Sequence, residues 1–408
     1  MEKNRVVITG MGIISNLGTS FVDVMNSLRT GYSRIIISEE RKKKGFRSAL
    51  TSELPPLDTK SRIDRRIRKF LSEAALYSVW GWLNAVDECQ LNVEHFTGKN
   101  VGIVLGNDSS SEPIPELMAI LDKYKETHFL GANMVIKTMN SCCSMNLGPI
   151  IGAQGINITI SAACASGAHA IGYSHSLLQS NQQEAIVTGG FQEMNWLSMS
   201  SFDALGAFST NPDPTKASRP FDYKRDGLVP GGGGAVLILE TLERAKRLQH
   251  KIYGEILSYG FSSDGSHLTI PTGDGAERCM RNALEQARIS PLEIDYIHAH
   301  ATSTPVGDRA EAGAIHKIFG SNGPVVSSTK SMTGHECWMA GASSVIYCLA
   351  MMQGGFIAPS INFDHQEEDA CKINITNKTI QEKPRTILCN SFGFGGTNAS
   401  IILKEFIE

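Results

Sequence analysis

Cys164 is the side chain whose surroundings most strongly suggest chemistry. It lies between residues 156–160, whose alternating β-branched pattern predicts a strand, and residues 167–179, whose small and then apolar side chains predict a buried helix. A cysteine at such a junction places its sulfur at a helix N-terminus, where unpaired backbone N–H groups and the helix dipole favour an anion and lower the thiol pKa. We therefore interpret Cys164 as a nucleophile and the other cysteines as structural.

Two histidines provide the partners that a nucleophile needs. His300 follows the apolar run of residues 294–297, and His335 follows the run of residues 324–326, at the ends of two predicted strands. Open α/β sheets place their chemistry beyond strand ends, and the chain adds a glycine-rich turn at residues 390–398. Together these features predict an active site.

The motifs that carry these residues resemble those of the β-ketoacyl-acyl-carrier-protein synthases. The resemblance runs from residues 6–12 to the last predicted strand and is closest to the type I and type II elongating enzymes, type I in particular. Four motifs occur in the family's order: Ser-Ala-Ala-Cys-Ala-Ser-Gly at 161–167, His-Ala-Thr-Ser-Thr-Pro at 300–305, Lys-Ser-Met-Thr-Gly-His at 330–335 and Asn-Ser-Phe-Gly-Phe-Gly-Gly-Thr-Asn at 390–398.

The resemblance implies a role for each catalytic side chain. Cys164 would hold an acyl group as a thioester, while His300 and His335 would point Nε2–H groups at the oxygen of an enolate. The family holds the thioester oxyanion with preorganised backbone N–H groups, here those of Cys164 and Phe394. Lys330 would act as a structural cation that raises the positive potential without touching the substrate.

The resemblance also implies a binding site for the arm that carries the substrate. Thr302 and Thr304 would hydrogen-bond the pantetheine, beside Gly395 and Gly396. Phe394 looks like the family's gating aromatic, because its glycine neighbours permit the backbone conformations that let a loop swing.

The implied activity is that of an acyltransferase, a 3-oxoacyl-[acyl-carrier-protein] synthase. An acyl group moves from a carrier thiol to Cys164, and malonyl-carrier then loses carbon dioxide and attacks the thioester in a Claisen condensation. The product is a fatty-acid or polyketide-like chain longer by one malonyl-derived unit. We expect acyl carrier protein as partner, a homodimer or a heterodimer with a related ketosynthase or chain-length-factor subunit, no separate cofactor and no metal.

The one dense run of basic residues supports two interpretations. Residues 60–69 are expected to open a helix that continues to about residue 85, and such a charged face is commonly just solvated. In the family the matching residues face the acyl carrier, an acidic protein for which a basic patch is a natural electrostatic partner. The candidate docking residues are Arg62, Arg65, Arg66 and Lys69.

The sequence departs from the family at the position nine residues after His335. Elongating enzymes of this type carry a glutamate there, whereas this chain has Ser344, and residues 336–339 replace the usual small residues. A lost carboxylate beside Lys330 would leave a less compensated cation. Residues 107–110, near the family's chain-length gate, are small and polar and predict a roomy tunnel that suits an unsaturated chain. A specialised ketosynthase of polyene or secondary-metabolite synthesis is therefore an alternative to an enzyme of fatty-acid synthesis.

Two other functions share the expected fold. A non-catalytic partner subunit that sets chain length would lack the nucleophile, but Cys164 and both histidines are present. A thiolase pairs its nucleophile with a second cysteine near the C-terminus, whereas the turn at residues 390–398 has none and Cys389 precedes it.

The elements that must position these residues repeat along the chain. Strands alternating with helices predict a mostly parallel sheet covered by helices, and the long repeat distance indicates a duplicated domain. Residues 1–250 would carry the nucleophile and residues 251–408 both histidines. The resemblance implies the thiolase fold, an α/β fold of duplicated halves in five layers, α-β-α-β-α. Residues 107–150 interrupt the alternation, where the family has its dimer contact, and residues 30–47 are expected to form an exposed loop.

The composition excludes several classes of protein. The 408 residues carry a formal net charge of −3 and are 41% hydrophobic, which is typical of a globular protein and gives no sign of nucleic-acid binding. We find no membrane-spanning run and no signal peptide before the first predicted strand. Nine cysteines without regular spacing argue for a reducing compartment, so a cytoplasmic location is expected.

Overall fold

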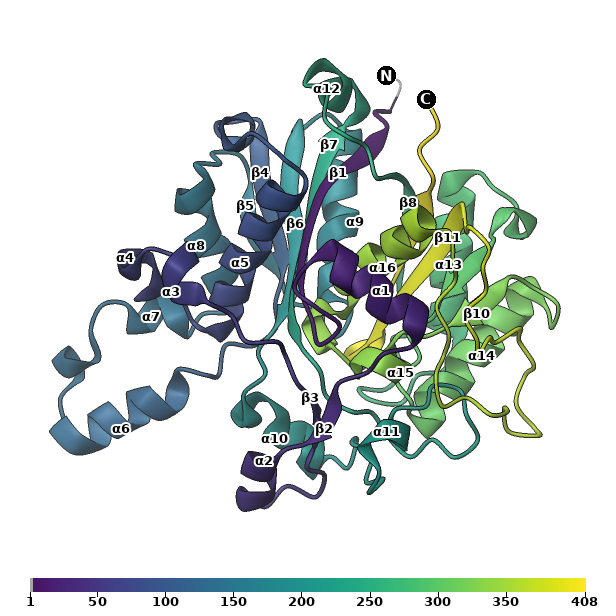
Figure 1. Ribbon diagram of the computed structural model, residues 1–408, viewed down its shortest axis with the longest axis horizontal. Coiled ribbons are helices and arrows are strands. Elements are labelled where there is room, and N and C mark those ends of the chain that lie inside the picture. The colour runs from purple at the N-terminus through teal and green to yellow at the C-terminus, as the bar shows by residue number, and fades with distance from the viewer. Residues whose placement is uncertain (1–2) are drawn as a thin grey trace.

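The computed structural model describes residues 3–408 and contains two halves with the same strand topology (Figure 1). The strands of the N-terminal half are β1 (Val6–Ile14), β4 (Val101–Gly106), β5 (Asn157–Ile160), β6 (Ala185–Gln192) and β7 (Gly233–Thr241). Those of the C-terminal half are β8 (Gly254–Ser263), β9 (Tyr296–His298), β10 (Val325–Ser327), β11 (Thr386–Gly393) and β12 (Thr397–Lys404).

The order of the strands confirms the predicted duplication. The N-terminal half has the order β1-β7-β6-β4-β5, and the C-terminal half has the equivalent order β8-β12-β11-β9-β10. In each half three neighbouring strands are parallel and the next two pairings are antiparallel. A short antiparallel pairing of β1 with β8 joins the halves edge to edge, so the strands form one continuous sheet of ten.

Two helices lie between the halves and form the central layer of the predicted five. They are α9 (Ser166–Gln179), which packs on strands of both halves, and α16 (Ala340–Gly354), which packs against α9. Their backbones approach so closely that a Cβ on Gly341 would lie 2.3 Å from the backbone nitrogen of Ala168. The small residues that follow Cys164 in the sequence are explained by this contact.

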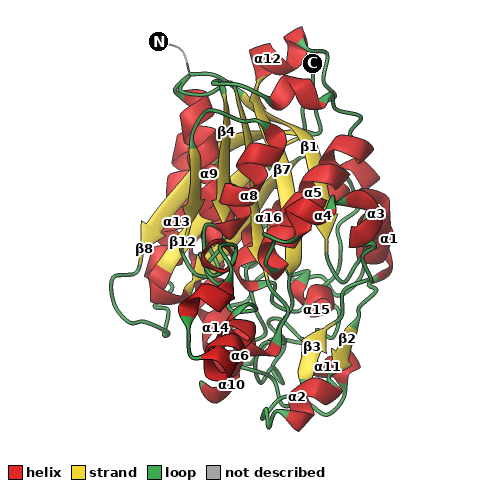
Figure 2. Cartoon of the chain, turned by 90° about the vertical axis from the view of Figure 1, so that its left-hand side faces the viewer, coloured by secondary structure: helices red, strands yellow, loops and turns green. Residues whose placement is uncertain are grey.

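Helices also cover the outer faces (Figure 2). On the N-terminal half these are α5 (Glu73–Glu88) and α8 (Cys142–Ile151), and on the C-terminal half α13 (Asp274–Ala287), with α14 (Pro305–Phe319) beside it. Large apolar cores fill the space between the halves and beneath each outer layer. Within residues 3–408 no helix is both long and apolar enough to cross a membrane.

The predicted helix from residue 60 to about residue 85 is wrong, because the chain forms three helices there. They are α3 (Thr59–Arg62), α4 (Arg65–Arg68) and α5. The carboxylates of Asp58 and Asp64 accept backbone N–H groups at the first turns of α3 and α4. Each aspartate is therefore an N-cap, which begins a new helix where the charge pattern alone indicated one continuous helix.

The predicted exposed loop at residues 30–47 is also wrong. It contains β2 (Ile35–Ile37), which pairs with β3 (Leu50–Ser52), and α2 (Glu39–Lys43). Arg41 is buried within it, and its Nη1 donates a hydrogen bond to the Leu50 carbonyl at 3.0 Å.

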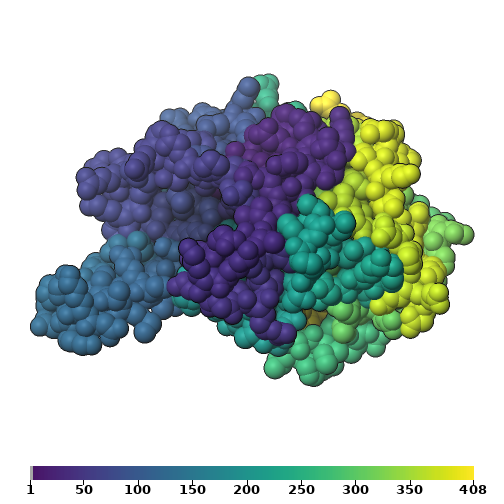
Figure 3. Space-filling model, turned by 60° about the horizontal axis from the view of Figure 1, so that its bottom comes forward, coloured from purple at the N-terminus to yellow at the C-terminus, as the bar shows by residue number. Residues whose placement is uncertain are grey.

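Residues 107–150 interrupt the alternation of strands and helices, as predicted, and their middle part forms an arm. The arm contains α6 (Ile114–Tyr124), which projects from the body of the molecule (Figure 3). It returns through α7 (Met134–Lys137) to α8. The remaining helices are α1 (Phe21–Thr30), α10 (Trp196–Ala204), α11 (Pro214–Ala217), α12 (Leu242–Arg247) and α15 (Lys330–Thr333), with short 3₁₀ turns at Val93–Phe96, Thr127–Leu130, Pro291–Glu293, Cys337–Met339 and Phe394–Gly396.

Candidate active site

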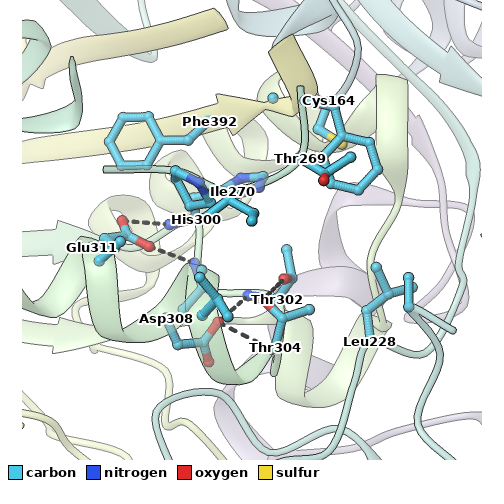
Figure 4. A pocket seen from close by; sticks show the side chains of 18 of the residues that line it. Cys164, Leu228, Thr269, Ile270, His300, Thr302, Thr304, Asp308, Glu311 and Phe392 are labelled. Carbon is cyan, nitrogen blue, oxygen red and sulfur yellow. Dashed lines mark hydrogen bonds between the residues drawn. The ribbon is translucent and has the colours of Figure 1, made fainter. Parts of the chain in front are cut away.

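One cavity of about 390 Å³ brings together the cysteine and the two histidines that the sequence predicts as catalytic. Cys164 reaches it from the N-terminal half, immediately before α9 (Figure 4). His300 and His335 reach it from the C-terminal half, after β9 and α15. The two halves therefore contribute complementary parts of one site.

A tight turn holds Cys164 between β5 and α9. Ala163 adopts a left-handed backbone with a φ of 47°, and its N–H donates to the Asp108 carboxylate at 2.9 Å. The Ser166 hydroxyl donates to the Ala163 carbonyl at 2.7 Å and accepts the Ala162 N–H at 2.8 Å. A strained backbone persists only where its surroundings fix it, and such strain clusters at active sites.

The thiol pKa of Cys164 is raised to about 12 by burial, so the expected lowering is wrong for this pocket. The charge of Lys330 and the backbone N–H groups of Phe394 and Cys164 act in the opposite direction without outweighing burial. A helix terminus supplies only partial charges, whereas a buried thiolate loses its hydration. The thiol is therefore protonated at rest and needs a nearby proton acceptor when it reacts.

His335 makes the closest polar contact with the thiol. Its Nε2 lies 3.0 Å from the Cys164 Sγ, and its ring is edge-on to that of His300 with centroids 5.3 Å apart. Burial, and then the charge of Lys330, hold the pKa of both histidines well below the ordinary value of 6.5. Both rings are neutral near pH 7, so each carries one N–H donor and one acceptor nitrogen.

Several buried polar atoms near the cavity have no hydrogen-bond partner within residues 3–408. They are the Nδ1 atoms of His300 and His335 and the Nζ of Lys330. Buried polar groups are ordinarily paired, so unpaired groups that gather around one cavity indicate a place for a polar ligand or for water.

Two buried carboxylates of α14 shape the loop that carries His300. Glu311 accepts the His300 backbone N–H at 2.9 Å, and Asp308 accepts the N–H groups of Thr302 and Thr304 at 3.0 and 3.2 Å (Figure 4). Sequence reasoning did not assign Asp308 to the site. Its place in the first turn of a helix, where acidic side chains are favourable, is the signal that could have found it.

Lys330 influences the site through its charge. It lies at the start of α15, is buried, and is absent from the lining of the cavity. Burial lowers its pKa, while the negative charges of Glu311 and Glu336 raise it. The predicted role of Lys330 as a cation that does not touch the substrate stays a prediction.

The expected loss of a carboxylate near Lys330 at residue 344 is offset in part by Glu336. Ser344 supplies none, but the carboxylate of Glu336 is buried and interacts electrostatically with Lys330. The hydroxyls of Ser343 and Tyr347 donate to it at 2.5 and 2.7 Å, although burial still raises its pKa to about 7. A carboxylate from a different position of the same segment therefore acts on Lys330 through its charge, without a direct hydrogen bond to the Nζ.

The predicted pantetheine residues lie on the same cavity, with one exception. Thr302 and Thr304 line it with their hydroxyl oxygens 3.2 Å apart, and Gly396 lines it as well, whereas Gly395 is absent from the lining. Gly396 has a φ of 72°, and a Cβ there would lie 2.6 Å from the Cβ of Asp264. No larger residue fits at this position without movement of the backbone.

Phe394, the predicted gate, lies at the cavity and is partly exposed. Its side chain is 36% exposed, lines the cavity and stacks on Phe202 with ring centroids 5.9 Å apart. Its role as a gate stays a prediction.

The four basic residues proposed for docking differ in their surroundings. Arg65, Arg66 and Lys69 are exposed. Arg62 instead donates to the Asn84 side chain at 2.7 Å, pairs with Asp87 and lies over the ring of Trp80. Arg62 thus fastens α3 to α5, while the side chains of the other three are exposed, Arg66 with its Nε 3.4 Å from the Asp64 carboxylate.

A second group of reactive side chains lies outside the cavity. One ligating atom from each of His298, Cys348 and Cys389 falls within 4.8 Å of the others, in the buried core. A structural zinc takes four such ligands, and within residues 3–408 this group offers three. Cys389 is absent from the lining of the cavity, so it is not placed to act as the second cysteine of a thiolase.

Comparisons with known proteins identify the family of the chain. Residues 3–245 match the family profile "Beta-ketoacyl synthase, N-terminal domain", and residues 253–364 match "Beta-ketoacyl synthase, C-terminal domain". The chain is 40% identical over 405 residues to 3-oxoacyl-[acyl-carrier-protein] synthase 1 of Escherichia coli (98% of this chain, 99% of the relative). It is 41% identical over 407 residues to the synthase 1 of Haemophilus influenzae (98% and 99%).

Solved structures show the same fold over the whole chain. A β-ketoacyl synthase from Burkholderia phymatum superposes with a TM-score of 0.93 at 30% identity, covering 99% of this chain and 100% of that one. The ishigamide ketosynthase/chain length factor gives a TM-score of 0.91 at 29% identity, with the same coverage. The chain belongs to the β-ketoacyl synthase family and has its thiolase-like fold.

Proposed function

We propose that this protein is a 3-oxoacyl-[acyl-carrier-protein] synthase of the synthase 1 type, which works in fatty-acid synthesis. The observation that carries the proposal is the Nε2 of His335 at 3.0 Å from the Cys164 Sγ, in a cavity that His300 shares. The curated relatives of similar length bear the same activity in their names. A specialised pathway is less well supported, because Glu336 supplies the carboxylate whose loss at Ser344 suggested one.

The first half-reaction transfers the acyl group. Cys164 loses its proton, and its sulfur attacks the carrier thioester, so that an acyl–Cys164 thioester forms and the carrier leaves as a thiol. The backbone N–H groups of Cys164 and Phe394, which both act on the sulfur, would hold the oxyanion of this step. His335 Nε2 is the neutral acceptor nearest to the thiol proton and passes that proton on to the departing carrier sulfur. The ring must then change to the tautomer with its proton on Nε2 before it can donate to the enolate in the second half-reaction.

The second half-reaction forms the carbon–carbon bond. Malonyl-carrier loses carbon dioxide, and the electrons of the broken bond form an enolate whose oxygen His300 and His335 stabilise as N–H donors. The enolate carbon attacks the acyl carbonyl, and Cys164 leaves as a thiolate that regains a proton. Neutral histidines suit this role, because their lowered pKa values keep the rings uncharged while the charge of Lys330 favours the anion.

Carbon dioxide release tests the function directly. We expect acylated enzyme and malonyl-carrier to yield carbon dioxide and 3-oxoacyl-carrier in equal amounts, as measured by trapping labelled carbon dioxide and by mass spectrometry of the carrier. Thiolytic cleavage of 3-oxoacyl thioesters without any decarboxylation would instead identify a thiolase.

We propose that the exposed basic residues Arg65, Arg66 and Lys69 dock the acidic carrier. Reversing the three to glutamate is expected to raise KM for carrier-bound substrates and to spare small pantetheine thioesters, which do not reach this surface. Raising salt should weaken the wild-type reaction with carrier, since exposed charges are screened over roughly 8–10 Å. Steady-state kinetics with both substrate types measure the effect.

A matched control reverses the exposed basic residues Lys99, Arg288 and Lys378, which lie outside the run. This variant changes the net charge equally, so an equal rise in KM would mean that overall charge and not a docking patch is responsible.

The projecting arm is proposed to meet a second subunit. It exposes large apolar side chains, among them Met118 at 57%, Phe129 at 47% and Val135 at 56%. Exposed apolar patches of this kind mark interaction surfaces. An identical subunit is the simplest occupant.

A cytoplasmic location stays a prediction that cell fractionation would check.

A further inference from the structure

The cavity at Cys164 opens toward one side of the sulfur. Its lining continues from Cys164 through Thr302 and Thr304 to Leu268 and Ile270, whose side chains are exposed by 77% and 53%. This side is the approach from solvent, and under the proposed function the pantetheine arm occupies it. If the pantetheine arm fills this side, an acyl group bound to the Cys164 sulfur must occupy a different part of the site.

Where the lining of the cavity reaches Phe202 and Leu228, a compact apolar cluster packs around Cys164. Its buried members besides Cys164 are Met199, Phe208, Leu228, Cys337 and Trp338, and Phe202 packs against them. The ring centroid of Trp338 lies 6.0 Å from that of Phe202, which in turn stacks on Phe208 at 6.3 Å. Of the aromatic rings in this cluster only Phe202 lines the cavity, so the rings of Trp338 and Phe208 fill the space behind it.

Hydrogen bonds fix the indole of Trp338 in this position. Its Nε1–H donates to the Ser109 hydroxyl at 3.0 Å, and the Ser109 hydroxyl donates to the Glu193 carboxylate at 2.9 Å. Glu193 is fully buried and also accepts the Ser111 backbone N–H at 2.9 Å. The indole is thus tied to a buried carboxylate through one serine.

The backbone of Trp338 is equally constrained. Its carbonyl oxygen lies 3.1 Å from where a Cβ on Gly167 would be and 2.8 Å from where one on Gly190 would be. The preceding residue, Cys337, has a left-handed backbone with a φ of 42°. The close contacts with two glycines and the strained turn fix the backbone of this segment. The indole therefore has little freedom to move away from Cys164.

The indole of Trp338 lies beside residues 107–110, where the sequence predicts a roomy tunnel. Trp338 packs against Ser109, and the Asn107 side chain donates to the Ser109 carbonyl at 2.9 Å. Asp108 turns its carboxylate to the Ala163 N–H beside the nucleophile. An apolar chain directed past Cys164 would meet an indole and a carboxylate.

We propose that Trp338 closes the acyl side of the site, so that the enzyme accepts short acyl groups such as acetyl or butyryl and rejects chains of decanoyl length. The inference rests on the proposed function. In that function Trp338 is a specificity-determining residue. Its indole limits the length of the acyl chain, whereas Cys164 and the histidines perform the reaction.

The test compares butyryl-carrier with decanoyl-carrier. Loading is followed by mass spectrometry of the intact protein and condensation by product formation. We expect the wild-type enzyme to prefer butyryl by about 100-fold, and Trp338→Ala to reduce that preference by about tenfold or more, since single methylene-sized changes in apolar pockets alter discrimination by 10–200-fold. Trp338→Phe is the matched control, because it keeps an aromatic ring but loses the N–H, and it should stay near the wild-type preference.

The outcomes separate the two proposals. Wild-type enzyme that loads and elongates decanoyl groups as well as butyryl groups would overturn the closure by Trp338. An unchanged preference in Trp338→Ala would do the same. Should that variant fail to fold, as judged by thermal unfolding, Trp338→Leu provides the same comparison with less lost volume. Failure of wild-type enzyme to form acyl–Cys164 at any chain length would overturn the proposed function itself.

Discussion

Cys164→Ala is expected to abolish acyl transfer. The alanine has no sulfur to form the thioester, and no other thiol lines the cavity among residues 3–408. Mass spectrometry of the intact variant after incubation with acyl-carrier should show no acyl adduct, and the condensation assay should show no product. The variant should fold, because the buried sulfur donates no hydrogen bond on which the turn depends and Ala163, Ser166 and Asp108 hold the backbone.

Cys279→Ala is the matched control for that result. Cys279 is equally buried, lies on α13 outside the cavity, and donates only to the Gly260 carbonyl. It should load acyl groups as the wild-type enzyme does. Continued elongation by Cys164→Ala would show that acyl groups pass between carriers without the covalent intermediate.

The positions of the candidate catalytic residues could be predicted from sequence because each lies in a local pattern. Cys164 stands between a strand and a helix, and His300 follows a strand, so chain order alone places them at sheet ends. The duplicated topology could also be predicted from the sequence, since a glycine-rich turn leads into a strand at both β7 and β12. Local patterns survive folding when nothing distant competes with them.

Properties that depend on distant residues could not be predicted in this way. The raised thiol pKa follows from burial by both halves, which the helix-terminus argument ignores. The role of Glu336 depends on hydroxyls that α16 presents, and that of Trp338 depends on Ser109, more than two hundred residues earlier in the chain. The separate helix starts at Asp58 and Asp64 are local features that the sequence could have indicated, since aspartate is a common N-cap. The run of basic residues favoured one continuous helix instead.

His300→Ala is expected to separate the two half-reactions. Condensation should slow by about 100-fold or more, the usual cost of losing one preorganised donor to an oxyanion. Loading should remain near the wild-type rate, because His300 makes no hydrogen bond to the sulfur whereas the backbone N–H groups of Cys164 and Phe394 approach it. Loading is measured by mass spectrometry of acyl–Cys164, and condensation by carbon dioxide release from malonyl-carrier with preloaded enzyme.

His335→Ala should slow condensation as much but should also impair loading to a smaller extent. Its Nε2 lies 3.0 Å from the thiol, so the variant loses both an enolate donor and the nearest proton acceptor. A thiol with a pKa near 12 needs that acceptor most when the pH is low, so the loading defect should shrink as the pH rises. Equal losses of loading and condensation in both variants would mean that the histidines serve only to ionise the thiol, and the enolate would then need another donor.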